Sequence, residues 1–201
     1  MSVTTTPLIA SSVLSARSSL SFGGTKREVL DLINMYGADL WVLIARQGTS
    51  AFTGFPPVVV IRPTYSTDAI RVPGDVYGRS TNNSAANKPT LSSGGGAGST
   101  AIVVNSATGF AVDQIIAIES GTSSVEWARI SKISGTTLTL DAPLIATHSN
   151  GVDVTNYAEV IYVPLPGNKQ YEIIVDYGNA TAGPDLDVKM LVNKYTGDIT
   201  A

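Results

Sequence analysis

Residues 99–154 read STAIVVNSATGFAVDQIIAIESGTSSVEWARISKISGTTLTLDAPLIATHSNGVDV, and no other stretch of the chain says more about its fold. Short apolar-rich segments alternate there with Gly, Ser and Thr, which is typical of short antiparallel strands joined by turns. Strands are expected at residues 100–104, 114–119, 125–133, 137–142 and 152–154. The pattern predicts a small, barrel-like β-domain over residues 99–156.

The expected strand at residues 125–133 (VEWARISKI) alternates, but both of its faces have mixed character. Val125 and Trp127 fall on one side, whereas Ala128 and Ile130 fall on the other. Each side also has polar or charged members. The alternation therefore leaves open which face of this strand is buried.

Longer strand-like segments flank this domain on both sides. Apolar and β-branched residues dominate residues 40–47, 58–61, 158–163, 171–177 and 186–192. Residues 26–34 (KREVLDLIN) fit either a short helix or a strand. Because a few strands are marginal alone, we expect an all-β fold: one antiparallel, jelly-roll-like β-sandwich built from residues 25–88 and 157–201, with the small domain inserted. Two separate domains in series are the alternative.

The stretch before the small domain, residues 71–98, contains no clear strand pattern. It ends in PTLSSGGGAG (residues 89–98), a composition typical of flexible linkers. So long a structureless stretch is uncommon inside one compact domain. We therefore expect a linker at residues 89–98.

The first 24 residues, MSVTTTPLIASSVLSARSSLSFGG, show no lasting strand or helix period. They also lack the basic start and apolar centre of a signal peptide. Composition alone is typical of a disordered tail, whereas an ordered segment of this kind would need a partner. We expect an extended arm over residues 1–24 that docks on a neighbouring subunit.

The composition narrows the function further. The chain has 201 residues, 43% hydrophobic but only 14% charged, compared with about 25% charged in average soluble domains. Such a surface suits a protein packed against neighbours. The net charge of −3 offers no basic surplus for binding nucleic acid, and no apolar run is long enough to span a membrane. Because cysteine is absent, disulfides, thiolate metal sites and cysteine nucleophiles are excluded.

Few residues form a pattern that suggests chemistry. His148 is the only histidine, and a loop or packing role is favoured over catalysis or metal binding. Asp185 and Asp187, with Asp176 nearby, could bind calcium, but the spacing of a calcium loop is missing and a solvated strand edge is the favoured interpretation. The glycine-rich residues 92–100 lack the Lys-Ser/Thr ending of a phosphate-binding loop. We therefore expect no enzyme, no catalytic or metal-binding residue and no cofactor.

Aromatic residues are only 7% of the chain. Those in expected strands could line a sugar platform, but core or interface packing is the favoured interpretation; they are Trp41, Trp127, Tyr157, Tyr162, Tyr171 and Tyr177. Aromatic residues in loops are better candidates for contacts with a partner. Our expected partner-binding residues come from the arm and from one such loop: Thr4, Leu8, Ile9, Val13, Leu14, Leu20, Phe52 and Phe55.

The strand and turn residues of the small domain resemble a β-module of tailed-phage virion proteins. The resemblance covers about a quarter of the chain and rests on TAIVV (100–104), ATGFAVD (107–113), IIAI (115–118) and ISKISGTTLTL (130–140), followed by Pro143-Leu144, His148 and Gly151. One turn differs, because the family usually has Gly-Asp where this chain has Asp113-Gln114. The flanking strands also resemble β-sandwich segments of small phage head proteins, more loosely.

The resemblance implies a virion structural protein similar to capsid decoration, or cement, proteins. Such a protein would be assembled in the host cytoplasm, would bind the major capsid protein on the outer capsid surface as a homotrimer or other homo-oligomer, and would stabilise the head. Two alternatives remain. One is a tail, baseplate or fibre component, and the other is a carbohydrate-binding module; either would bind host surface glycans.

Overall fold

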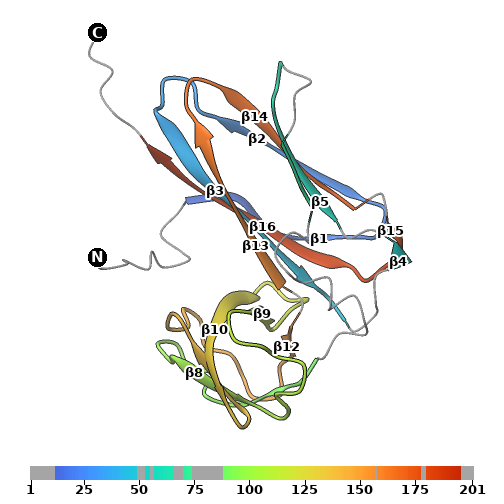
Figure 1. Ribbon diagram of the computed structural model, residues 1–201, viewed down its shortest axis with the longest axis vertical. Helices are drawn as coiled ribbons and strands as arrows, with labels where there is room; N and C mark the ends of the chain where they lie inside the picture. The colour runs from blue at the N-terminus through green and yellow to red at the C-terminus, as the bar shows by residue number, and fades with distance from the viewer. Residues whose placement is uncertain are drawn as a thin grey trace.

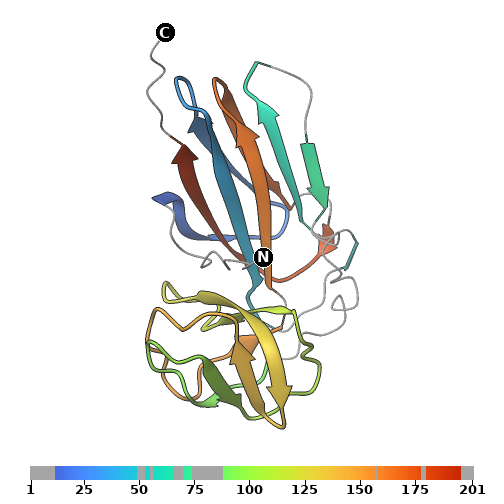
Figure 2. The same ribbon diagram turned by 60° about the vertical axis from the view of Figure 1, so that its left-hand side comes forward.

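Every regular element in the described part of the chain is a β-strand. The computed structural model describes residues 12–48, 53–54, 57–65, 70–73, 88–156, 158–177 and 180–195. Within these ranges there is no helix of the length and hydropathy needed to cross a membrane. The strands form a β-sandwich and a smaller β-domain next to it (Figures 1 and 2), so the predicted all-β, antiparallel fold class is confirmed.

The sandwich consists of two four-stranded antiparallel sheets. The first sheet has the order β1 (Ser12–Leu20), β16 (Leu186–Tyr195), β3 (Gly37–Arg46) and β13 (Ala158–Pro166). The second has the order β2 (Thr25–Asp31), β14 (Gln170–Asp176), β5 (Val58–Pro63) and β6 (Ile70–Pro73). A separate two-stranded sheet pairs β4 (Thr53–Gly54) with β15 (Ala180–Ala182). Each of the two large sheets therefore combines strands from before and after the small domain, and in the first sheet these strands alternate.

The central strand β3 shows why its sequence is apolar almost throughout. Leu40, Val42 and Ile44 point inward and pack against the second sheet in the main core. Leu43 and Ala45, on the other side of the strand, belong to a different cluster that includes residues of the small domain. A strand buried on both faces needs apolar residues at successive positions rather than at alternate ones.

The small domain is one curled sheet. Its six strands follow the order β12 (Val154–Thr155), β9 (Ile115–Ile118), β10 (Glu126–Ser134), β11 (Thr137–Leu140), β8 (Ala101–Val104) and β7 (Leu91–Ser93). The first and last strands meet, because the Leu91 amide donates to the Val152 carbonyl (2.8 Å) and the Val154 amide donates to the Pro89 carbonyl (2.8 Å). This closure surrounds an apolar interior that includes Ile102, Ile116, Ile130 and Leu138.

Strand β10 is buried on both faces over its first half, which explains its ambiguous sequence. Ala128 and Ile130 point into the interior of the small domain. Trp127 points the other way and packs with Leu43 and Leu191 of the sandwich. The alternation could not identify one buried face because the two faces are buried in different cores.

The expected N-terminal arm is corrected for residues 12–20, which form strand β1 of this chain's own sandwich. β1 pairs with β16, and Leu20 is buried in the main core with Leu14 packed against it. The strand period was hidden because the pairing shifts register twice, between Val13 and Ser15 and between Ser15 and Ser18. Residues 1–11 lie outside the described residues.

The expected linker at residues 89–98 is also corrected, because these residues are part of the small domain. Residues 91–93 form β7, and the amides of Gly98 and His148 donate to the carbonyls of Leu144 and Gly95 respectively. Gly94 and Gly98 have positive φ angles of 84° and 85°, a conformation that glycine adopts without a steric penalty. In residues 89–98 these glycines therefore allow particular backbone conformations. From composition alone, the same glycines had suggested a flexible segment.

Candidate functional site

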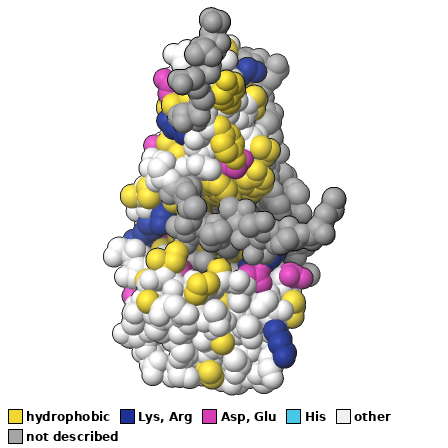
Figure 3. Space-filling model, turned by 90° about the vertical axis from the view of Figure 1, so that its left-hand side faces the viewer, with side chains coloured by type: hydrophobic (Ala, Val, Ile, Leu, Met, Phe, Trp, Pro, Cys, Tyr) yellow, Lys and Arg dark blue, Asp and Glu magenta, His cyan; other side chains and the backbone are white. Residues whose placement is uncertain are grey.

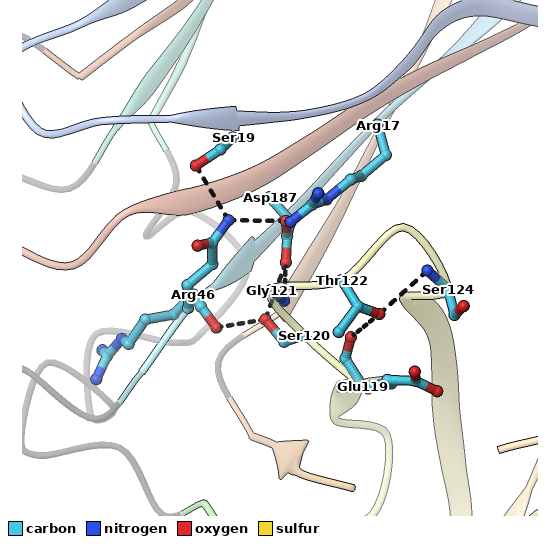
Figure 4. Close-up of polar contacts among 10 residues, drawn as sticks. Arg17, Ser19, Arg46, Glu119, Ser120, Gly121, Thr122, Ser124 and Asp187 are labelled. Carbon is cyan, nitrogen blue, oxygen red and sulfur yellow. Dashed lines mark hydrogen bonds and ion pairs between the residues drawn. The ribbon is translucent and has the colours of Figure 1, made fainter. Parts of the chain in front are cut away.

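The junction between the two domains is centred on the buried carboxylate of Asp187. This residue lies on β16, and its side chain is fully buried. Its Oδ1 accepts from Arg17 Nε of β1 (2.6 Å) and from Gln47 Nε2 (2.9 Å). Its Oδ2 accepts from the Gly121 amide (2.7 Å) in the turn between β9 and β10 (Figure 4). One carboxylate thus joins β1, β16 and the small domain.

Ser120 of the same turn strengthens this connection. Its hydroxyl lies 3.0 Å from Asp187 Oδ2 and 2.8 Å from the carbonyl oxygen of Arg46, at the end of β3. Buried charges are tolerated where they are paired and fully hydrogen-bonded, and Asp187 meets this condition. The calcium site considered for Asp185 and Asp187 is not formed: Asp187 is an internal structural group, and Asp185 is exposed. Among the described residues, no group of three or more acidic or histidine side chains could hold a metal ion.

An apolar cluster lies beside this polar centre. The small domain contributes Ala117, Val125 and Trp127, and the sandwich contributes Leu43, Ala45, Ala158 and Leu191. The indole Nε1 of Trp127 donates to the carbonyl oxygen of Ile44 (3.2 Å), and the residue is only 4% exposed. A buried apolar contact of this kind opposes relative movement of the two domains.

A cleft of about 230 Å³ opens next to the junction. Leu43, Lys189 and Leu191 line it from the sandwich, and residues 123–127 with Ile145 and Ala146 line it from the small domain. Pockets for drug-sized ligands have volumes of about 300–1,000 Å³, so this cleft is small. Its one carboxylate, Glu126, is already engaged by other groups of the protein.

Glu126 belongs to a buried cluster with the single histidine. The Nε2 of His148 lies 3.0 Å from Glu126 Oε2, and its Nδ1 lies 2.9 Å from Glu119 Oε2. Glu126 also accepts from the amides of Ile145 (2.8 Å) and Ala146 (3.1 Å). The cluster therefore ties the loop of residues 143–148 to β9 and β10.

The two ionisable partners favour each other's charged form. The hydrogen bond to Glu126 raises the pKa of His148 above its ordinary value of 6.5, despite the opposing effect of burial, and Glu119 adds to the rise. Burial alone would raise the pKa of Glu126, but the bonds from His148, Ile145 and Ala146 together lower it. Because both imidazole nitrogens face carboxylates, neither is left to act as a base on a substrate. The geometry agrees with the packing role favoured for this histidine.

A group of aromatic side chains covers the outer face of the first sheet, beyond the small domain. Tyr162 of β13 and Trp41 of β3 are direct partners across the strands, with ring centroids 5.6 Å apart and planes at 42°. Asp39, also on β3, accepts from the hydroxyls of Tyr162 (Oδ1, 2.7 Å) and Tyr195 (Oδ2). Tyr162 is 47% exposed and Tyr195 is 44% exposed. Hydrophobic side chains gather on this side of the sandwich in Figure 3.

The aromatic residues considered for a sugar platform are thus divided by the fold. Trp127, Tyr171 and Tyr177 are buried, as the packing interpretation expected. Trp41 and Tyr162 come together on the exposed face, and Tyr157 lies outside the described residues. Tyr195 and Asp39 were missed, although their positions on alternate, outward-facing sites of β16 and β3 were a usable signal.

The expected partner-binding residues differ in where the structure places them. Leu20 is buried in this chain's own core, so it offers no surface to a partner, whereas Leu14 is half-buried and packs against that core. Val13 is 56% exposed on the edge strand β1. The others, Thr4, Leu8, Ile9, Phe52 and Phe55, lie outside the described residues.

Comparison of the chain with protein-family models, with curated proteins and with solved structures finds no match.

Proposed function

We propose that the protein is a non-enzymatic structural component of a virion: a capsid decoration protein that binds the major capsid protein of a tailed phage as a homo-oligomer and stabilises the head. The observation that carries the proposal is the buried, hydrogen-bonded junction between its two domains. The resemblance of the small domain to a β-module of virion proteins directs the proposal to this class of particle.

The junction supports a mechanical function. Domains within one chain move relative to each other unless their interface is large and hydrophobic. Here Trp127 and Leu43 lie in an apolar contact, and Asp187 bonds to groups on both sides of the interface. These contacts would resist movement at the junction and so help the protein transmit force between neighbouring capsid subunits, which is what strengthening a shell requires.

The surface composition supports assembly against neighbours. Charged residues make up only 14% of the chain, and burying few charges limits the desolvation cost of protein contacts. Strand β1 (Ser12–Leu20) lies at an edge of the first sheet, and residues 1–11 precede it in the sequence. We place the anchor to the capsid in these residues, which include Thr4, Leu8 and Ile9, together with exposed Val13.

The experiment compares the full chain with a variant that begins at Ser12. Heads purified from a phage that encodes this chain, and lacking the protein, are mixed with each form and sedimented. The full chain should saturate the heads at a fixed number of copies and raise their rupture temperature. The shortened chain should lose this binding but keep its unfolding temperature, because β1 remains intact.

Two results would overturn the proposal. One is a full chain that neither sediments with heads nor stabilises them. The other is immunogold labelling of the intact virion on its tail, which would place the protein in a tail, baseplate or fibre. Equal binding by the shortened chain would reject residues 1–11 as the anchor.

A further inference from the structure

The exposed aromatic group on the first sheet has the features of a small binding site. Its residues are Asp39 and Trp41 of β3, Tyr162 of β13 and Tyr195 of β16. Neighbouring strands of one sheet hold them in fixed register: Tyr162 is opposite Trp41, and Tyr195 is opposite Gly37. We call this group the aromatic platform.

The two tyrosines of the platform are ordered before any ligand arrives. Each donates its hydroxyl to a different oxygen of the Asp39 carboxylate. These bonds raise the pKa of Tyr195 to about 12 and raise the pKa of Tyr162 as well, so both hydroxyls keep their protons at neutral pH. Side chains held in one rotamer lose little entropy when they bind, which increases affinity.

The carboxylate keeps capacity for further hydrogen bonds. An ionised carboxylate offers about four lone-pair sites, and the two tyrosines occupy one on each oxygen. Asp39 is half-buried, and Asn193, its partner across the strands on β16, is exposed. A carboxylate acceptor and an exposed amide side chain therefore lie on the same sheet face as the aromatic rings.

We propose that the aromatic platform binds a neutral saccharide, with a pyranose ring stacked on the aromatic side chains and adjacent hydroxyls donating to Asp39. A pyranose has a C–H face that suits an aromatic ring and hydroxyls at its edge that suit a carboxylate. Saccharide hydroxyls can donate to the lone pairs of Asp39 that the two tyrosines leave available. Acidic saccharides are excluded because Asp39 and the net charge of −3 would repel them.

The proposal is independent of the capsid function, because it concerns the isolated protein and another surface. The test is calorimetric titration of the full chain with cellohexaose, maltohexaose, chitohexaose and tetragalacturonate. At least one neutral oligosaccharide should bind, and tetragalacturonate should not. Tyr162→Ala should weaken binding about two- to tenfold, because it removes an aromatic contact.

Tyr65→Ala is the matched control. Tyr65 is 70% exposed and lies in the turn after β5, away from the platform, so this variant should bind like the unchanged protein. Thermal unfolding of both variants checks that they remain folded, and Asp39→Asn supplies a second platform variant that should also bind more weakly. The proposal is overturned if no neutral oligosaccharide binds, if only tetragalacturonate binds, or if Tyr162→Ala and Tyr65→Ala behave alike. It is also overturned if Tyr162→Ala dissociates a dimer in analytical ultracentrifugation, because the platform is then an interface between two copies.

Discussion

Replacing Trp127 with alanine should remove much of the connection between the two domains. The side chain is almost completely buried between β10 and the sandwich. A buried tryptophan removes about 150–250 Å² from water, and at about 25 cal/mol per Å² this corresponds to about 4–6 kcal/mol. Measured losses for Trp→Ala in protein cores are about 3–5 kcal/mol. We therefore expect the free energy of unfolding to fall by about 3–5 kcal/mol.

The assay is urea unfolding followed by circular dichroism and by the fluorescence of Trp41, the other tryptophan of the chain. Because Trp127 lies at the junction, its loss should also let the sandwich and the small domain unfold in separate steps. Trp127→Phe keeps the apolar ring but loses the donor to the Ile44 carbonyl, so it should cost only about 1–3 kcal/mol. A loss below about 1 kcal/mol for Trp127→Ala, or an equal loss for Trp127→Phe, would refute the idea that apolar burial at the junction joins the domains.

Three further predictions concern the buried polar groups and the glycines. Asp187→Asn should lower the free energy of unfolding, measured by urea unfolding, by about 2–3 kcal/mol. This loss is smaller than the usual loss of about 3–5 kcal/mol for a broken buried ion pair, because the side chain of Arg17 is 21% exposed. An unchanged stability would contradict the central role of Asp187 at the junction. Because the folded protein raises the pKa of His148, the stability that this residue adds is fully present below pH 6.5 and is lost as the pH rises through its folded pKa. The free energy of unfolding measured across this pH range should therefore decline, and His148→Gln should abolish the decline. The same decline in both proteins would assign it to other ionisable groups. Gly95→Ala should destabilise the chain by about 1–3 kcal/mol because the new methyl group would meet the His148 carbonyl oxygen, whereas a methyl group at Gly96 would make only an ordinary contact with Ser99 Oγ (3.7 Å). Equal melting temperatures for the two variants would mean that residues 89–98 are not packed as described.

The strands of the small domain could be predicted because their residues follow the period of a half-buried strand between clear turns. Residues 137–140, for example, alternate in burial as the sequence TLTL suggests. Strand β1 could not be recognised in the same way, because its two register shifts break the alternation of SVLSARSSL. The glycines after β7 were misleading, since composition does not distinguish a flexible segment from one that needs positive φ angles.

The polar centres of the molecule depend on contacts between distant residues. The partners of Asp187 lie at positions 17, 47, 120 and 121, which no local pattern connects. A signal existed in the strand itself, because an aspartate within LDVKMLV is unusual unless it is paired. The two glutamates around His148 come from other segments, so the sequence predicted a packing role for this histidine but not its partners.

The closure of the small domain has an evolutionary consequence. The chain enters at Pro89 and leaves after Val154, and the Val154 amide bonds to the Pro89 carbonyl, so the entry and exit points are adjacent. A unit with adjacent ends can be gained, lost or exchanged between genes without rearranging its host. Its exchange is restricted here by the footprint that it leaves on the sandwich: Leu43, Ala45 and Leu191 would face water without it. Any replacement module would have to present a matching apolar patch, so the inserted domain and its host are expected to change together.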